Sequence, residues 1–390
     1  MVDEDSFGGV PRLKESLQRV WFESNLGQNA GQVLAAGLEH LRHDHHSGSR
    51  ELTAIALGVF RGVAVAMGAD ETNSGWWDRI RMVAWHLWKN GRESMGSPIL
   101  NAMIAALNRI EPITFDHDAT PDRLGRVLAA IDYVIEGRKS TTACIREAFT
   151  SYLHNQLLSN NDPNSPITIL TLSASSTIRE CIIHAAIALD SPGLDIRLLE
   201  SRPLYEGVSF ASTLLSHFQS HSKTSPVKIT LYPDAAAALA SPGIDVLLLG
   251  ADRITASGAV SNKTGSLPAT LSVRHISPAA KVVVLSELEK VAEPDQSDLH
   301  VVEENDITEI VGGWQHGKAR GLEIIQGALQ GHRSMEDSGL SLKVKNIYFE
   351  WVPPELVDAY ICENGVQGVS EIQARSRWVG QQAERLFGGL

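Results

Sequence analysis

Short apolar runs alternate with helical segments from residue 167 to residue 285, and this alternation limits the folds that the chain can adopt. Strands are predicted for residues 167–172, 194–199, 227–231, 246–249 and 281–285. The segments between them, 177–189, 209–219, 235–240 and 267–274, have the apolar spacing of helices. Repeated strand–helix units with uniformly apolar strands are buried on both faces of a sheet. The pattern therefore predicts an α/β fold with a Rossmann-like parallel sheet.

The first 158 residues have a different pattern. Apolar residues in segments 52–65 and 98–107 recur at every third or fourth position, which predicts helices. The polar stretch 159–166, Ser-Asn-Asn-Asp-Pro-Asn-Ser-Pro, is typical of a domain boundary. We therefore predict an N-terminal helical bundle over residues 1–158 and a Rossmann-like C-terminal domain over residues 166–390. The C-terminal domain contains an irregular excursion near 287–342.

Composition excludes several classes of protein. The 390 residues are 43% hydrophobic, so the chain can bury a sizeable core. The formal net charge of −12 and the lack of a basic run argue against direct binding of nucleic acid. The sequence contains no stretch of about 18 apolar residues, so it predicts no membrane span. The three cysteines, Cys144, Cys181 and Cys362, are odd in number and far apart, so a reducing, cytoplasmic location is expected.

No cofactor and no metal are expected. The turn 171–177 after the first strand contains no glycine, so the Gly-x-Gly-x-x-Gly fingerprint of dinucleotide-binding folds is absent there. His43, His45 and His46 follow one another closely in a polar segment, which indicates a solvated loop and not a metal site.

The segment 247–266 holds the first candidate site. A strand ends at Gly250, and Asp252 follows at its carboxyl end, where ligands collect in open α/β sheets. A glycine-punctuated loop then presents Asn262, Lys263 and Ser266 before the next helix. A lysine beside loop amides and a hydroxyl suits a phosphate-bearing ligand, and a buried carboxylate suits proton transfer. The alternative is that Asp252 pairs structurally with the arginine that follows it.

Two other strand ends also have polar residues that suit an anion. Ser173, Ser175, Ser176 and Thr177 follow the first strand, and their hydroxyls can cap a helix or hold an anion with its free amides. Arg202 follows the second strand and could clamp an anion, or it could pair with Glu200 or Glu206.

The last motif, residues 348–366, predicts the end of a strand and then a helix. Pro354 suits the first position of that helix, Glu355 its first turn and Gly365 its C-cap.

These motifs, in this order, resemble one superfamily. It contains the α, β and δ regulatory subunits of eukaryotic translation initiation factor 2B, methylthioribose-1-phosphate isomerase and ribose-1,5-bisphosphate isomerase. The resemblance spans nearly the whole chain and rests on these segments: Ser47-Gly-Ser-Arg-Glu-Leu, Ile169-Leu-Thr, Glu200-Ser-Arg-Pro with Glu206-Gly207, Gly250-Ala-Asp-Arg-Ile with Gly258, Asn262-Lys-Thr-Gly-Ser, and Val352-Pro-Pro-Glu-Leu with Glu363-Asn-Gly-Val. It implies a helical N-terminal half, a Rossmann-like half that dimerises, and a cleft for phosphorylated ligands.

The resemblance also implies two catalytic positions for the isomerases, a cysteine after the first strand and the aspartate of Gly-Ala-Asp. In this chain Asp252 matches the aspartate, whereas Ser173 stands at the cysteine position. The regulatory subunits also tend to lack that cysteine, but they usually lack a complete Gly-Ala-Asp-Arg motif as well. The sequence therefore combines a feature of each branch.

Two hypotheses follow from the resemblance. In the first, the protein resembles the regulatory subunits, binds a phosphorylated sugar or nucleotide, and acts in translation initiation by association. Arg202, Asn262 and Lys263 would hold phosphate, Asp252 a sugar hydroxyl, and Arg50 would close the cleft. In the second, it is an aldose-1-phosphate isomerase that uses Asp252 with Ser173 or a water. The expected partners are a phosphorylated small molecule and a second copy or a related subunit.

Overall fold

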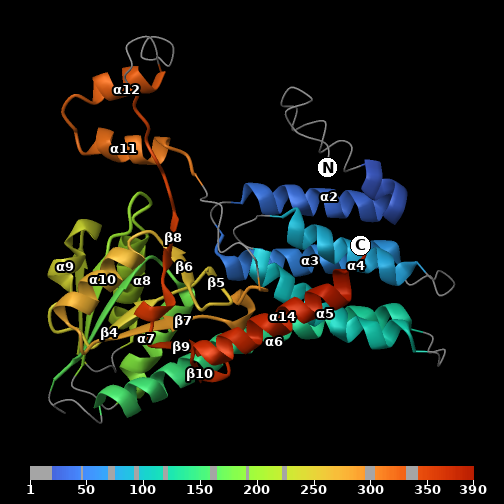
Figure 1. The fold of residues 1–390 in the computed structure, drawn as a ribbon, viewed down its shortest axis with the longest axis horizontal. Helices are drawn as coiled ribbons and strands as arrows, with labels where there is room; N and C mark the ends of the chain where they lie inside the picture. The colour runs from blue at the N-terminus through green and yellow to red at the C-terminus, as the bar shows by residue number, and fades with distance from the viewer. Residues whose placement is uncertain are drawn as a thin grey trace.

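The computed structural model describes most of the chain, and it begins with a bundle of helices (Figure 1). The described residues are 20–44, 47–68, 75–91, 96–116, 122–158, 165–189, 193–221, 226–294, 304–330 and 341–390. The helices of the bundle are α2 (Gln28–His43), α3 (Ser49–Met67), α4 (Trp76–Lys89), α5 (Gly96–Thr114) and α6 (Arg123–Leu153), which ends in a π-helical turn, η3 (His154–Leu158). Their apolar faces share one core.

A seven-stranded sheet follows. Its strands are β1 (Ile167–Leu172), β2 (Leu194–Leu199), β3 (Val227–Tyr232), β4 (Val246–Leu249), β7 (Lys281–Leu285), β9 (Ala359–Cys362) and β10 (Gly365–Gln367). The order is β10-β9-β7-β4-β1-β2-β3, and only β10 is antiparallel to its neighbour. The helical first half followed by a mostly parallel sheet confirms the predicted fold class.

Helices cover both faces of this sheet. Successive residues of a strand point to opposite faces, and β1 and β4 are buried at every position, so both faces are apolar and need a covering layer. On one face, α6, α7 (Ser176–Ala188) and α8 (Glu206–Ser220) share a core with Ile169, Ile196 and Leu248. On the other, α9 (Ala237–Ala240) and α10 (Ser266–Ile276) pack against Leu170 and Leu247.

The predicted loop between β4 and α10 is a β-hairpin, which is a correction to the sequence reading. Strands β5 (Arg253–Ile254) and β6 (Val260–Lys263) pair, and β6 also pairs with β8 (Phe349–Val352) from much later in the chain. The excursion between β7 and β8 contains two helices, α11 (Thr308–His316) and α12 (Leu322–Gln330). They project beyond the α/β half in Figure 1.

The helix predicted after Pro354 is wrong. Only the short 3₁₀ turn η6 (Pro354–Leu356) forms there, and the chain continues into β9 and β10. Gly365, expected as a helix C-cap, begins β10 with φ = 94°. Residues 359–362 are all buried, so sheet burial outweighs the local helix signals.

The final helix, α14 (Val369–Phe387), returns to the bundle. Val379, Leu386 and Phe387 belong to the same core as α3, α4 and α5. Figure 1 shows α14 running from the sheet back along α5. The two halves are therefore interleaved in sequence.

Candidate functional site

The order in which the chain adds strands to the sheet reverses between β1 and β4, and the candidate residues lie at this point. The strand order runs one way from β1 through β2 to β3 and the other way through β4 to β7, so the connections that leave β1 and β4 diverge. Such divergence opens a crevice at the carboxyl ends of the strands, where ligands bind in open α/β folds. Gly250 permits close packing there: a Cβ added to it would lie 3.2 Å from Asn262 Oδ1 and 3.8 Å from Ser175 Oγ.

Ser173, Glu206 and Lys263 form a connected group at this edge. The Ser173 hydroxyl donates to Glu206 Oε2 over 2.9 Å, and Lys263 Nζ lies 3.1 Å from Glu206 Oε1. The main-chain N–H of Ser173, a residue with φ = 66°, donates to Ser201 Oγ over 2.7 Å. The first turn of α8, which holds Glu206, thus joins the end of β1 to β6.

The Lys263 side chain is much more enclosed than that of Arg202. Its side chain is 12% exposed, and Nζ lies 4.5 Å from the centre of the Tyr348 ring and 5.2 Å from that of Phe349. The pairing of β6 with β8 sets Lys263 opposite Phe349. Aromatic faces attract a cation, so the ammonium is stabilised by one carboxylate and two rings.

The amides expected to hold an anion beside Lys263 are already occupied. Glu350 Oε1 accepts from the main-chain N–H of Gly265 over 2.6 Å and of Leu267 over 2.9 Å, at the start of α10. Asn262 Nδ2 donates to Ser266 Oγ over 2.8 Å, and that hydroxyl donates to Lys263 O over 2.6 Å. A carboxylate at a helix N-terminus is favourable because it faces the positive end of the helix dipole.

The structural alternative for Arg202 is the one observed. Its Nε donates to Glu200 Oε1 over 2.7 Å, and its side chain is 58% exposed. The hydrogen bond to Glu200 and its charge raise the pKa of Arg202. At the first turn, Ser175 caps α7 by accepting from Ile178 N–H, and Ser176 is exposed.

Arg50 lies within the helical bundle and holds α3 to α6. It donates to Thr142 Oγ1 and, over 3.2 Å, to the main-chain oxygen of Arg138.

Glu287 and Lys290 form an enclosed ion pair near Asp252, and the sequence analysis did not predict this pair. Lys290 Nζ donates to Ala251 O over 2.5 Å and lies 3.4 Å from Glu287 Oε2, while Thr177 Oγ1 donates to Glu287 Oε1 over 2.8 Å. Burial lowers the pKa of Lys290, but the charges of Glu287 and Asp252 outweigh it and raise the pKa. An acid and a lysine three residues apart after the strand 281–285 were the available signal.

The thiols are unsuited to acid–base work at this edge. Burial, together with the charge of Glu287, raises the pKa of Cys181 to about 12. Burial also raises the pKa of Cys362, with the charges of Glu363 and Glu287 acting in the same direction. Cys144 is exposed on α6. Both buried thiols therefore stay protonated near neutral pH.

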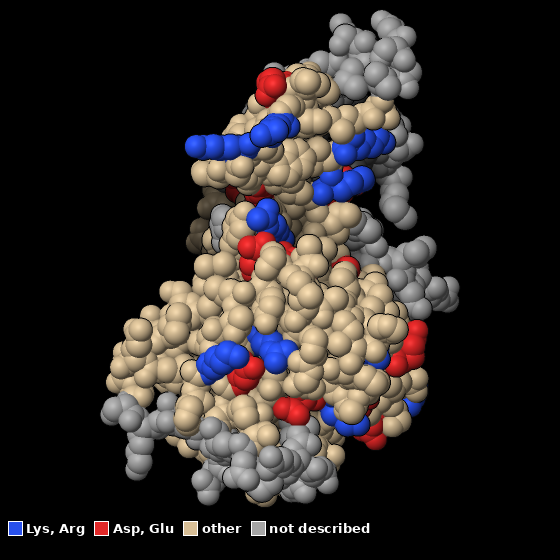
Figure 2. Space-filling model, turned by 90° about the vertical axis from the view of Figure 1, so that its left-hand side faces the viewer, with Lys and Arg blue, Asp and Glu red and all other residues tan. Residues whose placement is uncertain are grey.

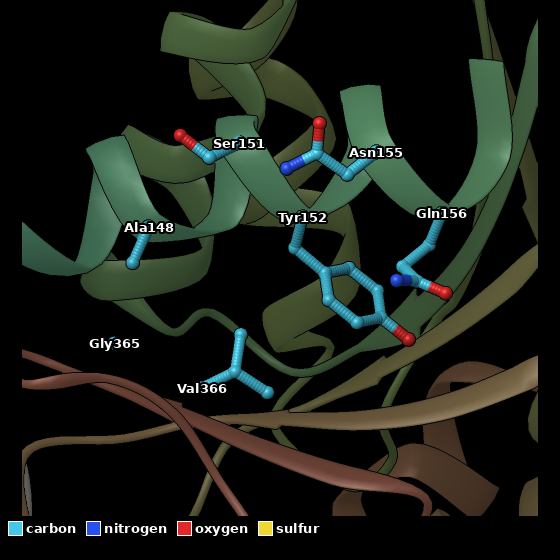
Figure 3. Close-up of a pocket in the computed structure, with 7 residues that line it drawn as sticks. All are labelled: Ala148, Ser151, Tyr152, Asn155, Gln156, Gly365 and Val366. Carbon is cyan, nitrogen blue, oxygen red and sulfur yellow. The ribbon is translucent and has the colours of Figure 1, made fainter. Parts of the chain in front are cut away.

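A pocket of about 240 Å³ lies elsewhere, between the end of α6 and β10 (Figure 3). Tyr152 on α6 and Gln156 on η3 point toward the side of Val366, and Asn155 also lines the pocket. None of the residues predicted for the site lines this pocket. Among the described residues, no group of three or more His, Cys, Asp or Glu side chains could hold a metal ion. Within the same residues, no helix has both the length and the apolar character needed to span a membrane.

Comparison with known proteins gives a consistent picture. A sequence model of the Initiation factor 2 subunit family matches residues 97–368. The chain is 29% identical over 190 residues to methylthioribose-1-phosphate isomerase of Magnetococcus marinus, covering 47% of this chain and 46% of that protein. It is 23% identical over 320 residues to the enzyme of that name from Marinobacter nauticus, covering 80% of each.

Solved structures share the fold at low sequence identity. The tetrameric eIF2B-beta2-delta2 complex of C. thermophilum contains a chain with 14% identity and a TM-score of 0.61, covering 92% of this chain and 98% of that one. 5-Methylthioribose 1-phosphate isomerase of Pyrococcus horikoshii has 17% identity and a TM-score of 0.55, covering 93% of this chain and 88% of that one.

Proposed function

Because this chain belongs to the initiation factor 2 subunit family, we propose that it acts by ligand binding and association, with a regulatory or assembly role in translation initiation. Its ligand is a phosphorylated sugar or nucleotide, bound at the carboxyl edge of the seven-stranded sheet. Turnover is not part of this role.

The Ser173 hydroxyl is the observation that favours binding over turnover. The isomerase resemblance requires a thiol at this position, and a thiol loses its proton near pH 8.5, whereas a serine hydroxyl is a far weaker acid. The Ser173 hydroxyl is also already donated to Glu206. Cys181 and Cys362 are buried with raised pKa values, so neither supplies a thiolate in its place.

Lys263 is the residue best suited to hold the phosphoryl group. A buried ammonium interacts more strongly with an anion than an exposed one, because less water screens it. Arg202 is mostly exposed and can turn toward a ligand as a second contact. Asn262, Ser266, Ser175 and Ser176 complete the polar edge, and Asp252 binds a sugar hydroxyl. Arg50, which joins α3 to α6, closes the cleft from the helical half.

An aldose-1-phosphate isomerase is the second candidate, and Asp252 favours it. This carboxylate follows β4 beside the buried Lys290, whose pKa it helps to raise. Buried acid–base groups at strand ends are typical of catalytic sites. In this reading Asp252 is the general acid/base, and Ser173 or a water replaces the thiol.

A phosphorus and proton NMR assay separates the two functions. The purified protein is offered methylthioribose-1-phosphate, ribose-1,5-bisphosphate and ribose-1-phosphate in parallel. Binding without turnover predicts shifted or broadened ligand signals and no ketose. Ketose that forms with the parent protein and disappears with Asp252→Asn would establish the isomerase.

Two variants then identify the group that holds phosphate. Lys263→Ala should weaken binding of ribose-1-phosphate by about tenfold or more, the loss expected for a close charge pair. Asp252→Asn should change it much less. Equal binding by the parent and Lys263→Ala would remove Lys263 from the site.

We also propose a homodimer or a hetero-oligomer with related subunits. Figure 2 views the molecule from the side of α8, α9 and α10, and the α/β part of this face has few charged side chains. Val208, Leu215, Leu239 and Leu271 on these helices are all at least 43% exposed. These exposed apolar side chains, on a side of the molecule with few charges, are the observation that supports association. Light scattering after gel filtration tests this, and a monomeric mass, alone and with related subunits, would count against it.

A further inference from the structure

Tyr348 is fixed at two points beside Lys263. Its main-chain oxygen accepts from the N–H of Thr264 over 2.8 Å, and its hydroxyl donates to Glu309 Oε2 on α11. Tyr348 is buried, and the centre of its ring lies 4.5 Å from Lys263 Nζ. The ring that faces the Lys263 ammonium is therefore held by a carboxylate from the excursion between β7 and β8.

The sequence analysis did not connect this excursion with the candidate site. In Figure 1, α11 lies between α12 and the α/β half. Asn346 Nδ2 donates to Asp306 O over 2.6 Å and to Glu309 Oε2 over 2.8 Å. These two bonds attach the start of α11 to the segment before β8 without involving the site. The bond from the Tyr348 hydroxyl to Glu309 is additional, and it is the one that leads to Lys263.

This bond acts on the cation in two ways. It fixes the plane of the Tyr348 ring, so the Lys263 ammonium has a stationary face to pack against. Donation to a carboxylate also makes the phenol ring more electron-rich, which strengthens its attraction for a cation. A lysine that is already fixed has less conformational entropy to lose when it binds an anion. Loss of the bond should therefore loosen Lys263 and weaken its contact with a ligand.

We propose that Glu309 is a positioning residue, which holds the Lys263 ammonium in place through the Tyr348 ring. The expected effect on ligand affinity rests on the proposed function, in which Lys263 holds the ligand. The positioning of Lys263 itself depends on no ligand. The excursion thus has a role at the candidate site, because α11 supports the aromatic wall beside Lys263.

NMR of protein labelled with carbon-13 at the ε carbon of lysine reports the position of Lys263. Protons above an aromatic ring are shifted upfield, so the Lys263 signal should be upfield in the parent and missing in Lys263→Arg, which assigns it. The shift should fall in Glu309→Ala, because the ring loses its anchor. Glu309→Gln keeps an acceptor for the hydroxyl and should restore most of it. Tyr348→Phe keeps the ring without the bond and should resemble Glu309→Ala.

Lys89 is the control within the same spectrum. Its Nζ lies 3.6 Å from the centre of the Trp88 ring, so its signal should stay the same in every variant that folds. Glu323→Ala removes an exposed acid from the neighbouring helix α12 and should leave the Lys263 signal unchanged. In a titration with ribose-1-phosphate, Glu309→Ala should bind about threefold to tenfold more weakly than the parent, the range for a lost cation–ring contact.

The outcomes separate the positioning role from the proposed function. An unchanged Lys263 signal in Glu309→Ala, or in Tyr348→Phe if Glu309→Ala does not fold, would overturn the proposal whether or not the sugar phosphate binds. A signal that moves while the affinity stays at the parent value would overturn the role in binding. If the signal moves and even the parent does not bind ribose-1-phosphate, the proposed function fails and the positioning of Lys263 stands.

Discussion

Arg138 on α6 and Glu289 in the short turn η5 (Leu288–Lys290) join the helical bundle to the α/β half by two parallel hydrogen bonds. Nη2 lies 2.6 Å from Oε1 and Nε 3.0 Å from Oε2, with the side chains only 14% and 15% exposed. Asn101 on α5 also donates to Glu289 O, over 2.9 Å. The next residue, Lys290, contacts Ala251 beside Asp252. One turn therefore links the bundle to the candidate site.

Arg138→Leu should lower the free energy of unfolding by about 3 kcal/mol, because it leaves the Glu289 carboxylate buried without its partner. The double variant Arg138→Leu/Glu289→Leu should lose less, since no charge is then stranded. Urea unfolding of the parent and the variants measures both. A double variant that loses as much as Arg138→Leu, or more, would show that a stranded carboxylate is not the cause of the loss.

Gly207→Ala should destabilise the protein by about 2 kcal/mol or more. A Cβ at this position would lie 1.9 Å from Leu199 O, so α8 would have to move away from the end of β2. Gly58→Ala is the matched control, because Gly58 is exposed within α3 and a Cβ there would have no neighbour within 4 Å. That variant should gain about 0.5–1 kcal/mol. A neutral Gly207→Ala would contradict the packing of α8 described above.

Iodoacetamide should modify Cys144 much faster than Cys181 and Cys362 in the folded protein. Cys144 is exposed, whereas the other two thiols are buried and have raised pKa values. The thiolate is the reactive form, so both effects protect them. Peptide mass spectrometry over time measures each rate, and all three should react in denaturant. Fast modification of Cys181 in the folded state would show a reactive thiolate there and would favour the isomerase function.

Stability should fall as the pH is lowered through the titration range of His86. Burial, assisted by the charge of Arg42, lowers the pKa of His86 from 6.5 to about 4. Between these two values the unfolded chain binds the proton more readily, so acid favours unfolding; above pH 6.5 the effect is absent. His86→Phe, which keeps a ring against Phe22, should flatten the pH dependence of the urea midpoint in this range. An unchanged slope would assign the effect to other groups.

The apolar runs in the sequence were sufficient to predict most strands of the sheet. Strands β1, β2, β4 and β7 lie where the apolar runs predict them, because each is a short buried run with no competing signal. Residues 354–365 differ because Pro354, Glu355 and Gly365 mimic helix-end signals. Their true conformation depends on pairing between β9 and β7, which is not local.

The site was predictable in its position but not in its pairing. Ser175, Asn262 and Gly250 come together because strand ends meet at one edge. The partners of Lys263 and of the α10 amides, Glu206 and Glu350, depend on contacts between segments 57 and 85 residues apart. Such contacts follow from β6–β8 pairing and the placement of α8, which no local pattern specifies.

The return of α14 to the bundle has a consequence for biosynthesis. A ribosome releases α2 to α6 long before residues 369–387, yet Val379, Leu386 and Phe387 fill the same core as those early helices. The bundle must therefore remain incomplete, with apolar surface open to solvent or to a chaperone, until the whole sheet has been synthesised. The helical half, made first, is finished last.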